Sequence, residues 1–288
     1  MKSAKPTGSA DRATCFFMLT FRDLLTGLRK IGLDPTKPII AHASLSAFGR
    51  IQGGAEAMLG AMLATSDTLI MPAFTYKTMI VPEVGPPDNG INYGRSYASN
   101  RSAQIFDPEM PVDPLMGTLS ETLRRHPKSR RSLHPILSFT GINAEAALEA
   151  QTYAEPLAPI RIIAEEGGWV LLLGVNHTVN TSIHYAERLS GRKQFVRWAL
   201  TQHGARECPG FPGCSEGFQA IAPKLEGVSR KVQIGSGQVE AVPLPKLIET
   251  VSSWIQADPT ALLCSRSYCK RCSAARNEGL IKADSELI

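Results

Sequence analysis

The sequence of 288 residues lacks any apolar run near the ~20 residues that a membrane-spanning helix requires. The apolar segment 15–19 is short and follows a polar stretch, so we expect no signal peptide. Neither sign of charge dominates, because 31 Lys and Arg residues oppose 26 Asp and Glu residues and leave a net charge of +5. An excess this small does not indicate a nucleic-acid-binding surface. These absences predict a soluble, cytoplasmic protein with no membrane or nucleic-acid partner.

The two ends of the chain are poor in structural signals. We expect residues 1–18 to be a disordered leader and residues 277–288 to be a tail. The residues between them, 19–276, are enough for one large α/β domain with a full hydrophobic core.

Strand and helix signals alternate in the first part of this domain. Residues 39–43 indicate a buried strand, 55–63 a helix and 67–72 a second buried strand. This order is a βαβ unit and predicts a parallel sheet. The most apolar run, residues 169–175, predicts a strand at the centre of the sheet that is covered on both faces.

Three further segments predict strands: residues 136–141, 195–206 and 228–242, the last two antiparallel and connected by turns. The predicted fold is therefore a single α/β domain whose mixed sheet has a parallel centre and helices on both faces. Residues 75–117 form a long loop rich in Pro, Gly, Asn and Asp, which we expect to frame a substrate cleft. Basic residues crowd into segment 124–131, as a solvated helix end or as a phosphate contact.

Two histidines and an amide follow the predicted central strand. His177, Asn180 and His184 come after residue 175, at the end of a strand where open α/β sheets bind ligands. His184 and Glu187 are spaced i, i+3 and share one face of a helix. Amine acylation needs a base, because an ammonium has no lone pair, and histidine suits that role near neutral pH. The alternative is that one histidine is a hydrogen-bonded structural residue.

Motifs in this chain resemble those of the aminoglycoside 3-N-acetyltransferase family. The segment 171–187 resembles the family signature. The family's early coenzyme-binding loop resembles residues 42–49 with 53–55. The stretch after that loop resembles residues 106–108 with 116–117. The family's Arg-Ser-x-His-Pro motif resembles residues 131–135. The resemblance covers roughly residues 20–275 and implies a fold unrelated to that of the general GNAT acetyltransferases. Residues 50–55 also fit a loose GNAT pattern, but the βαβ context argues against it.

The resemblance implies a role for each residue of the site. The general base corresponds to His184 rather than His177. The carboxylate that orients its imidazole is placed at Glu207, with Glu187 and Glu216 as rivals. Contacts to the amine substrate are expected from Asn180, His177 and Glu187.

Coenzyme A contacts are expected from small loop residues, whose backbone N–H groups can approach a phosphate, and from an arginine that can bind one. These residues are Ser44, Leu45, Ser46, Arg131, Ser132 and Phe139. Backbone N–H groups in the loop at Ser44 would stabilise the oxyanion of the reaction.

The sequence contains six cysteines, and five of them lie between residues 208 and 272. A late cluster in a chain without a signal peptide indicates metal binding more than disulfides. Cys208 and Cys214, with the CxxC pair Cys269 and Cys272, have the spacing of a structural zinc site, and Cys264 is a reserve ligand. The alternative is a set of reduced thiols without metal.

These interpretations predict an acetyl-CoA-dependent N-acetyltransferase, a monomer or homodimer, that confers antibiotic resistance by acetylating the 3-amino group of an aminoglycoside. Its partners would be the small-molecule amine and coenzyme A. A second hypothesis is an acyltransferase of the same fold acting on another amine in natural-product metabolism, which the basic net charge favours because polycationic aminoglycosides prefer acidic clefts. A third is a zinc-containing protein that binds coenzyme A or a metabolite without turnover.

Overall fold

The computed structural model describes residues 18–94 and 100–279. The expected leader, residues 1–18, lies outside these ranges except for Met18, which begins strand β1 (Met18–Leu19). The expected tail, residues 277–288, lies outside them from residue 280 onward, and helix α9 (Lys270–Glu278) includes its first two residues.

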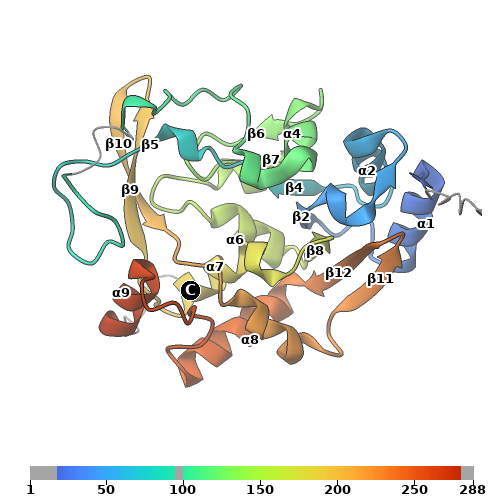
Figure 1. Ribbon diagram of the computed structural model, residues 1–288. Coiled ribbons are helices and arrows are strands. Elements are labelled where there is room, and N and C mark those ends of the chain that lie inside the picture. Colours follow the sequence, from blue (N-terminus) through green and yellow to red (C-terminus); the bar gives the residue numbers. More distant parts are fainter. Residues whose placement is uncertain (1–17, 95–99, 280–288) are drawn as a thin grey trace, which may run out of the picture.

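A mixed seven-stranded sheet forms the centre of the molecule (Figure 1). In spatial order its strands are β11 (Arg230–Ile234), β12 (Gly237–Pro243), β8 (Trp169–Leu173), β2 (Ile39–Ala43), β4 (Leu69–Pro72), β7 (Phe139–Ile142) and β6 (Arg130–Arg131). Strand β2 pairs in parallel with both β4 and β8, and all the other pairings in this sheet are antiparallel. The predicted mixed sheet with a parallel centre is confirmed.

Helices cover both faces of this sheet (Figure 1). The helices on one face are α1 (Phe21–Lys30), α2 (Gly54–Leu63) and α4 (Gly117–Arg125). Those on the other are α5 (Glu145–Glu149), α6 (Ala158–Glu165), α7 (Ser182–Leu189) and α8 (Leu244–Ala257). Alternate strand residues enter the two cores: Ile39 and Ala41 face the first layer, whereas Ile40 faces the second. Burial on both faces explains why the central strands are almost continuously apolar in sequence.

A smaller antiparallel sheet lies beside the main one and consists of β10 (Gly204–Phe211), β9 (Phe195–Thr201) and β5 (Met79–Ile80). The antiparallel strands expected over 195–206 are β9 and the start of β10, which form a hairpin that continues to Phe211. A two-stranded parallel pair joins β1 to β3 (Arg50–Ile51). Short 3₁₀ helices complete the fold: η1 (Leu45–Phe48), η2 (Tyr76–Thr78), η3 (Pro114–Met116), η4 (His177–Val179) and η5 (Phe218–Leu225).

The strand expected over 136–141 begins only at Phe139, because a histidine turns the chain before it. Nδ1 of His134 accepts hydrogen bonds from the backbone N–H groups of Ile136, at 3.2 Å, and Leu137, at 3.0 Å. The apolar pattern predicted a strand there, but the side-chain acceptor competes with the sheet for these donors.

Gly174 allows the ends of β8 and β2 to approach each other. It has a φ of +66°, a backbone conformation that residues with a side chain rarely adopt. A Cβ atom at this position would lie 2.5 Å from Cβ of Ala47 and 2.8 Å from the carbonyl oxygen of Ser44. The loop after β2 is therefore packed directly against the turn that follows β8.

We expect Gly174→Ala to lower the free energy of unfolding by about 3 kcal/mol, because a left-handed backbone and a steric clash both act there. Gly227→Ala is the matched control, since Gly227 has a φ of +81° but nothing within 4 Å of an added Cβ. The control should cost about 1–2 kcal/mol for the backbone alone. Denaturant unfolding measures both values, and equal losses would contradict the close approach.

Candidate active site

A cavity of about 710 Å³ opens at the carboxyl ends of β2, β4 and β8. Its walls are the loops that follow these strands, the start of α4, the loop after β10 and the first turn of α9. The lining residues are 41–46, 71, 72, 74, 76, 114–118, 175, 178–181, 184, 211–213, 215 and 271. Both ends of the long loop 75–117 contribute to the wall. Open α/β sheets bind their ligands at this position.

His184 lines the cavity and belongs to a buried chain of three ionisable side chains. Its Nδ1 lies 2.7 Å from Oε2 of Glu187, and Oε1 of Glu187 lies 2.7 Å from Nη1 of Arg192. Nη2 of Arg192 donates to the carbonyl oxygens of Pro259 and Ala261. Glu187 is 1% exposed and Arg192 is 4% exposed, so their charges compensate each other away from water.

The contact with Glu187 determines how the imidazole of His184 is used. An ionised carboxylate only accepts hydrogen bonds, so Nδ1 carries the proton and Nε2 of the neutral ring keeps its lone pair. The ring is also held by Phe218, whose centroid lies 4.6 Å away in an edge-on arrangement. The contacts therefore hold the ring of His184 with Nε2 as its free nitrogen.

Three helix starts contribute to the cavity wall. Leu45 and Ser46 begin η1, Gly117 and Thr118 begin α4, and Thr181 precedes α7. Backbone N–H groups in a first helical turn have no acceptor within the helix and carry partial positive charge. At α7 the N–H groups of the first three residues already donate to Asn180 and Thr181, so the starts of η1 and α4 are the ones that can offer donors to a ligand. This part of the cavity consequently favours a negatively charged group.

Glu207, the carboxylate expected to orient His184, is not near it. It lies on β10 opposite Trp198 and is exposed. Its neighbour Cys208 is buried in the core, and successive side chains of a strand point to opposite faces. The structure corrects this assignment to Glu187. The other rival, Glu216, is an exposed ion-pair partner of Arg266.

His177, expected to contact substrate, is fully buried and does not line the cavity. Its backbone N–H donates to Oε1 of Gln219 at 2.9 Å, and its Nδ1 lies 3.2 Å from Nδ2 of Asn180. Its Nε2 lies 3.8 Å from Oε2 of Glu240. The structure therefore gives His177 a structural role, whereas Asn180 reaches the cavity and accepts the N–H of Ser182 before α7.

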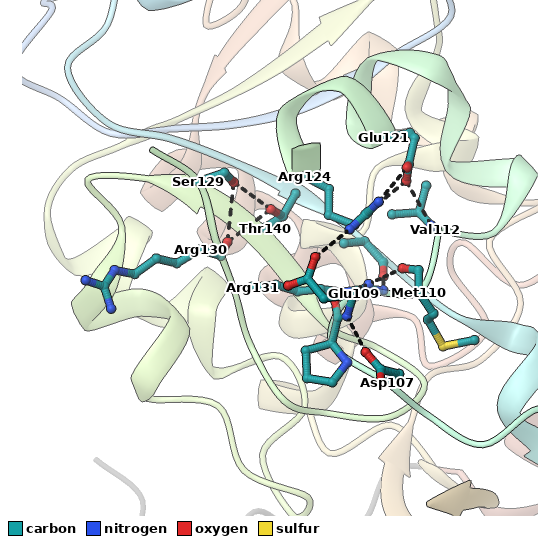
Figure 2. A network of polar contacts seen from close by, with 12 residues as sticks. Asp107, Glu109, Met110, Val112, Glu121, Arg124, Ser129, Arg130, Arg131 and Thr140 are labelled. Carbon is teal, nitrogen blue, oxygen red and sulfur yellow. Dashed lines mark hydrogen bonds and ion pairs between the residues drawn. The ribbon is translucent and has the colours of Figure 1, made fainter. Parts of the chain in front are cut away.

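Arg131 is half-buried and does not line the cavity. It belongs to a network of polar contacts with neighbouring segments (Figure 2). Its guanidinium donates to the carbonyl oxygens of Ala73 (2.6 Å), Pro108 (3.0 Å) and Met110 (2.6 Å) and to Oγ of Ser138 (3.1 Å). Burial lowers its pKa to about 10, which leaves it charged at neutral pH. The expected phosphate contact is therefore corrected to a structural one that attaches the loop around residue 110 to the end of β4.

Two other expected coenzyme contacts also have structural roles. Oγ of Ser132 accepts the N–H of Phe139 at 2.8 Å, and the Phe139 side chain is completely buried. Of the residues expected to bind coenzyme A, only Ser44, Leu45 and Ser46 line the cavity.

His42 is a cavity residue that begins the motif matched to the coenzyme-binding loop but was given no role of its own. It lies on β2, and its buried Nε2 has no hydrogen-bond partner among the described residues. Burial lowers its pKa to about 3, with a further contribution from His177, so the ring is neutral at physiological pH. Its place at the end of a predicted parallel strand was the signal that could have identified it. Arg271 and Met116 are further cavity residues without an assigned role.

Four of the late cysteines form a thiol cluster: Cys214, Cys264, Cys269 and Cys272, whose sulfur atoms all lie within 4.8 Å of one another. All four are free thiols. A hydrogen bond from Cys272 lowers the pKa of Cys214 to about 5, so a thiolate is available at neutral pH. Cys208 is not a member, because its side chain is buried in the main core. The expected ligand Cys208 is corrected to Cys264.

Comparisons with known proteins identify the family that this chain resembles. A family model described as aminoglycoside 3-N-acetyltransferase matches residues 40–256. Aminoglycoside N(3)-acetyltransferase IX of Micromonospora chalcea is 26% identical over 263 residues, which cover 80% of this chain and 91% of that protein.

Solved structures share the fold. The apoenzyme of aminoglycoside acetyltransferase AAC(3)-IVa superposes with a TM-score of 0.75 and 23% identity over 91% of this chain and 99% of that one. A mutant of the same enzyme in complex with a gentamicin gives a TM-score of 0.73, with 23% identity over 91% of this chain and 98% of that one. AAC-IIIb, in a binary complex with CoASH, gives 0.67, with 23% identity over 84% of this chain and 97% of that one.

We expect Arg131→Met to lower the free energy of unfolding by about 3 kcal/mol or more, because several buried carbonyl oxygens lose a charged donor. Arg130→Met is the control, since the Arg130 side chain is 71% exposed and points away from this network (Figure 2). The affinity of folded Arg131→Met protein for coenzyme A should stay within about threefold of wild type, as for a substitution remote from the ligand. Calorimetry tests this, and a large loss of affinity would restore the phosphate-binding role.

Proposed function

The chain belongs to the aminoglycoside 3-N-acetyltransferase family, a family of N-acetyltransferase enzymes, and from this premise we propose that it acetylates the 3-amino group of an aminoglycoside with acetyl-CoA. The observation that carries the proposal is the pair of His184 and Glu187 at the cavity, with a 2.7 Å contact that leaves Nε2 of the histidine as a base. A binding protein without turnover would not need this arrangement.

In the proposed mechanism both substrates are bound together. Nε2 of His184 accepts a proton from the amine while the amine nitrogen attacks the thioester carbonyl carbon of acetyl-CoA. The tetrahedral intermediate collapses, the C–S bond breaks, and the coenzyme A thiolate leaves. The imidazolium returns its proton to that sulfur, so that the products are the acetamide and the free thiol.

Glu187 supports both protonation states of His184 in this mechanism. Its carboxylate keeps the proton on Nδ1 of the neutral ring and then stabilises the imidazolium. Arg192 in turn holds Glu187 in place and compensates its charge, because a buried carboxylate without a partner would be costly.

The helix starts at η1 and α4 support a position for coenzyme A on that side of the cavity. Their N–H groups would bind the phosphates and pantetheine oxygens. The N–H groups of Leu45 and Ser46, the first two of η1, would stabilise the oxyanion of the intermediate. The CoASH complex of the related AAC-IIIb supports this choice of ligand.

One observation favours the second candidate function, acetylation of another amine. In the described part of the chain, the cavity wall includes Arg271 but no Asp or Glu. A polycationic aminoglycoside would be favoured by carboxylates, whereas a less basic amine would not need them.

We also propose a cellular location, an oligomeric state and a metal site. The described residues include no helix that is long and apolar enough to cross a membrane. We propose a cytoplasmic resistance enzyme that acts as a monomer or homodimer. We also propose that the thiol cluster holds a structural zinc ion, because four sulfur donors at this separation fit a tetrahedral site without an open position.

We expect His184→Ala to lower kcat by about 10²–10⁴-fold, the usual contribution of a positioned base, and to leave acetyl-CoA binding intact. Glu187→Gln should lower kcat by about 10²-fold or more, because a neutral amide does not stabilise the imidazolium. Glu207→Gln is the control and should stay within about twofold of wild type. Steady-state kinetics measure kcat for each variant. A kcat of His184→Ala near that of wild type would reject His184 as the general base. A large loss of kcat in Glu207→Gln would support Glu207, the residue expected from the sequence, as the orienting carboxylate.

The oxyanion role of the η1 start can be tested by removing one backbone N–H. Leu45→Pro removes the backbone N–H of residue 45, the first residue of η1, a position where proline is tolerated. The preceding Ser44 already has the extended conformation that a following proline requires. We expect kcat to fall by about 10²–10³-fold relative to Leu45→Ala, which loses the same side chain but keeps the N–H. Equal kcat values for the two variants would exclude this N–H from the oxyanion site.

A further inference from the structure

The thiol cluster joins two segments that are distant in sequence. Cys214 lies in the loop after β10, whereas Cys264 and Cys269 lie between α8 and α9, and Cys272 lies in the first turn of α9. A tetrahedral zinc site with Zn–S bonds of about 2.3 Å places its sulfurs about 3.8 Å apart. The separations in the cluster, at most 4.8 Å, are close to that value. The backbone N–H of Cys264 also donates to Sγ of Cys272 at 3.4 Å, a contact that stabilises a thiolate ligand.

Few apolar side chains surround the thiols themselves. Apart from the cysteines, the apolar cluster here includes just Leu263 among the described residues, whereas the nearby Leu262 and Ala274 pack into the main core. The buried residues of α9 are Cys272, Ala274 and Ala275, which remove little apolar surface from water. A small unit with so few apolar contacts commonly needs a metal to hold its structure.

The same two segments form one wall of the catalytic cavity, which we call the acceptor wall: residues 212, 213, 215 and 271. Gly213 and Ser215 flank Cys214, and Arg271 directly precedes Cys272. Nη1 of Arg271 donates to the carbonyl oxygen of Gly213 at 2.8 Å. Every residue of this wall is therefore within two positions of a clustered thiol.

The acceptor wall also lies beside Glu187. A Cβ atom at Gly213 would lie 4.0 Å from Oε2 of Glu187. Arg192, which binds the other oxygen of Glu187, donates to Pro259 and Ala261, a few residues before Cys264. A Cβ atom at Gly217 would lie only 2.3 Å from the carbonyl oxygen of Leu262, so the two segments are tightly apposed here.

We propose that a zinc ion bound by the thiol cluster holds the acceptor wall in place, and that Arg271 is the residue of this wall that positions the amine substrate. This rests on the proposed function of the cavity. The wall lies on the side of β10 and α9, away from β2 and α2, where the coenzyme-binding loop is located (Figure 1). An arginine only donates hydrogen bonds, so its partner on the acceptor is an oxygen atom, such as a hydroxyl, ether or carboxylate oxygen.

The test compares wild type with Cys269→Ser, Arg271→Gln and a control, Cys208→Ser, in which a buried thiol outside the cluster is changed. Protein is purified without chelator, and its zinc is measured by elemental analysis. We expect about one zinc per chain in wild type, Cys208→Ser and Arg271→Gln, and less than about a tenth of that in Cys269→Ser. Zinc absent from wild type, or retained in full by Cys269→Ser, overturns the metal site.

Kinetics and hydrogen exchange then test the role of the wall. Loss of zinc in Cys269→Ser and loss of the guanidinium in Arg271→Gln should each raise KM for the amine about tenfold or more, as for a lost charged hydrogen bond, with KM for acetyl-CoA unchanged. Amide exchange should accelerate at residues 212–217 in Cys269→Ser but not at residues 39–48. Unchanged exchange at residues 212–217, or equal changes in both KM values, overturns the proposal.

These measurements separate the two levels of inference. If no amine is acetylated, the proposed function fails, while zinc content and exchange at residues 212–217 still judge the metal and its effect on the wall. If acetylation occurs and Arg271→Gln retains the wild-type KM for the amine, the positioning role of Arg271 is rejected and the proposed function stands.

Discussion

The buried carboxylate of Glu187 is the group on which the rest of the site depends. An isolated anion at this depth would cost several kcal/mol, so both of its oxygens need cationic or donor partners. Helix α7 supplies His184 one turn earlier, and the chain just beyond the helix supplies Arg192. Arg192 in turn requires the carbonyl oxygens of Pro259 and Ala261. The orientation of His184 therefore depends, through Glu187 and Arg192, on the packing of the segment after α8.

The cavity has two sides of different character. On one side, the starts of η1 and α4 present backbone N–H groups at the ends of the parallel strands, which suits an anionic coenzyme. On the other, the loop after β10 and the start of α9 present Gly213 and Arg271, held by contacts with each other and with the thiol cluster. The close approach at Gly174 brings the loop after β2 against the turn after β8.

Buried arginines in this protein serve the backbone more than a ligand. Arg131 binds three carbonyl oxygens from two segments, and Arg192 binds two carbonyl oxygens in addition to its ion pair. A guanidinium has donors in a fixed planar array, so it can join chain segments that no regular secondary structure connects. An arginine in a sequence motif can therefore either bind a phosphate or connect chain segments. The two roles are distinguished by the groups that accept its hydrogen bonds in the structure.

The sequence by itself determined the elements whose signals are local. The buried strands at 39–43 and 169–173, the helices beside them and the parallel centre followed from apolar runs and their order. The placement of His184 and Glu187 on one helix face followed from their spacing. Tertiary structure alone decided the partners across the chain. Glu187 rather than Glu207 contacts His184, because strand alternation turns Glu207 to solvent. Cys264 rather than Cys208 joins the thiols, because the core takes Cys208. Such choices depend on which face of an element is buried and against what, and no local pattern in the sequence contains that information.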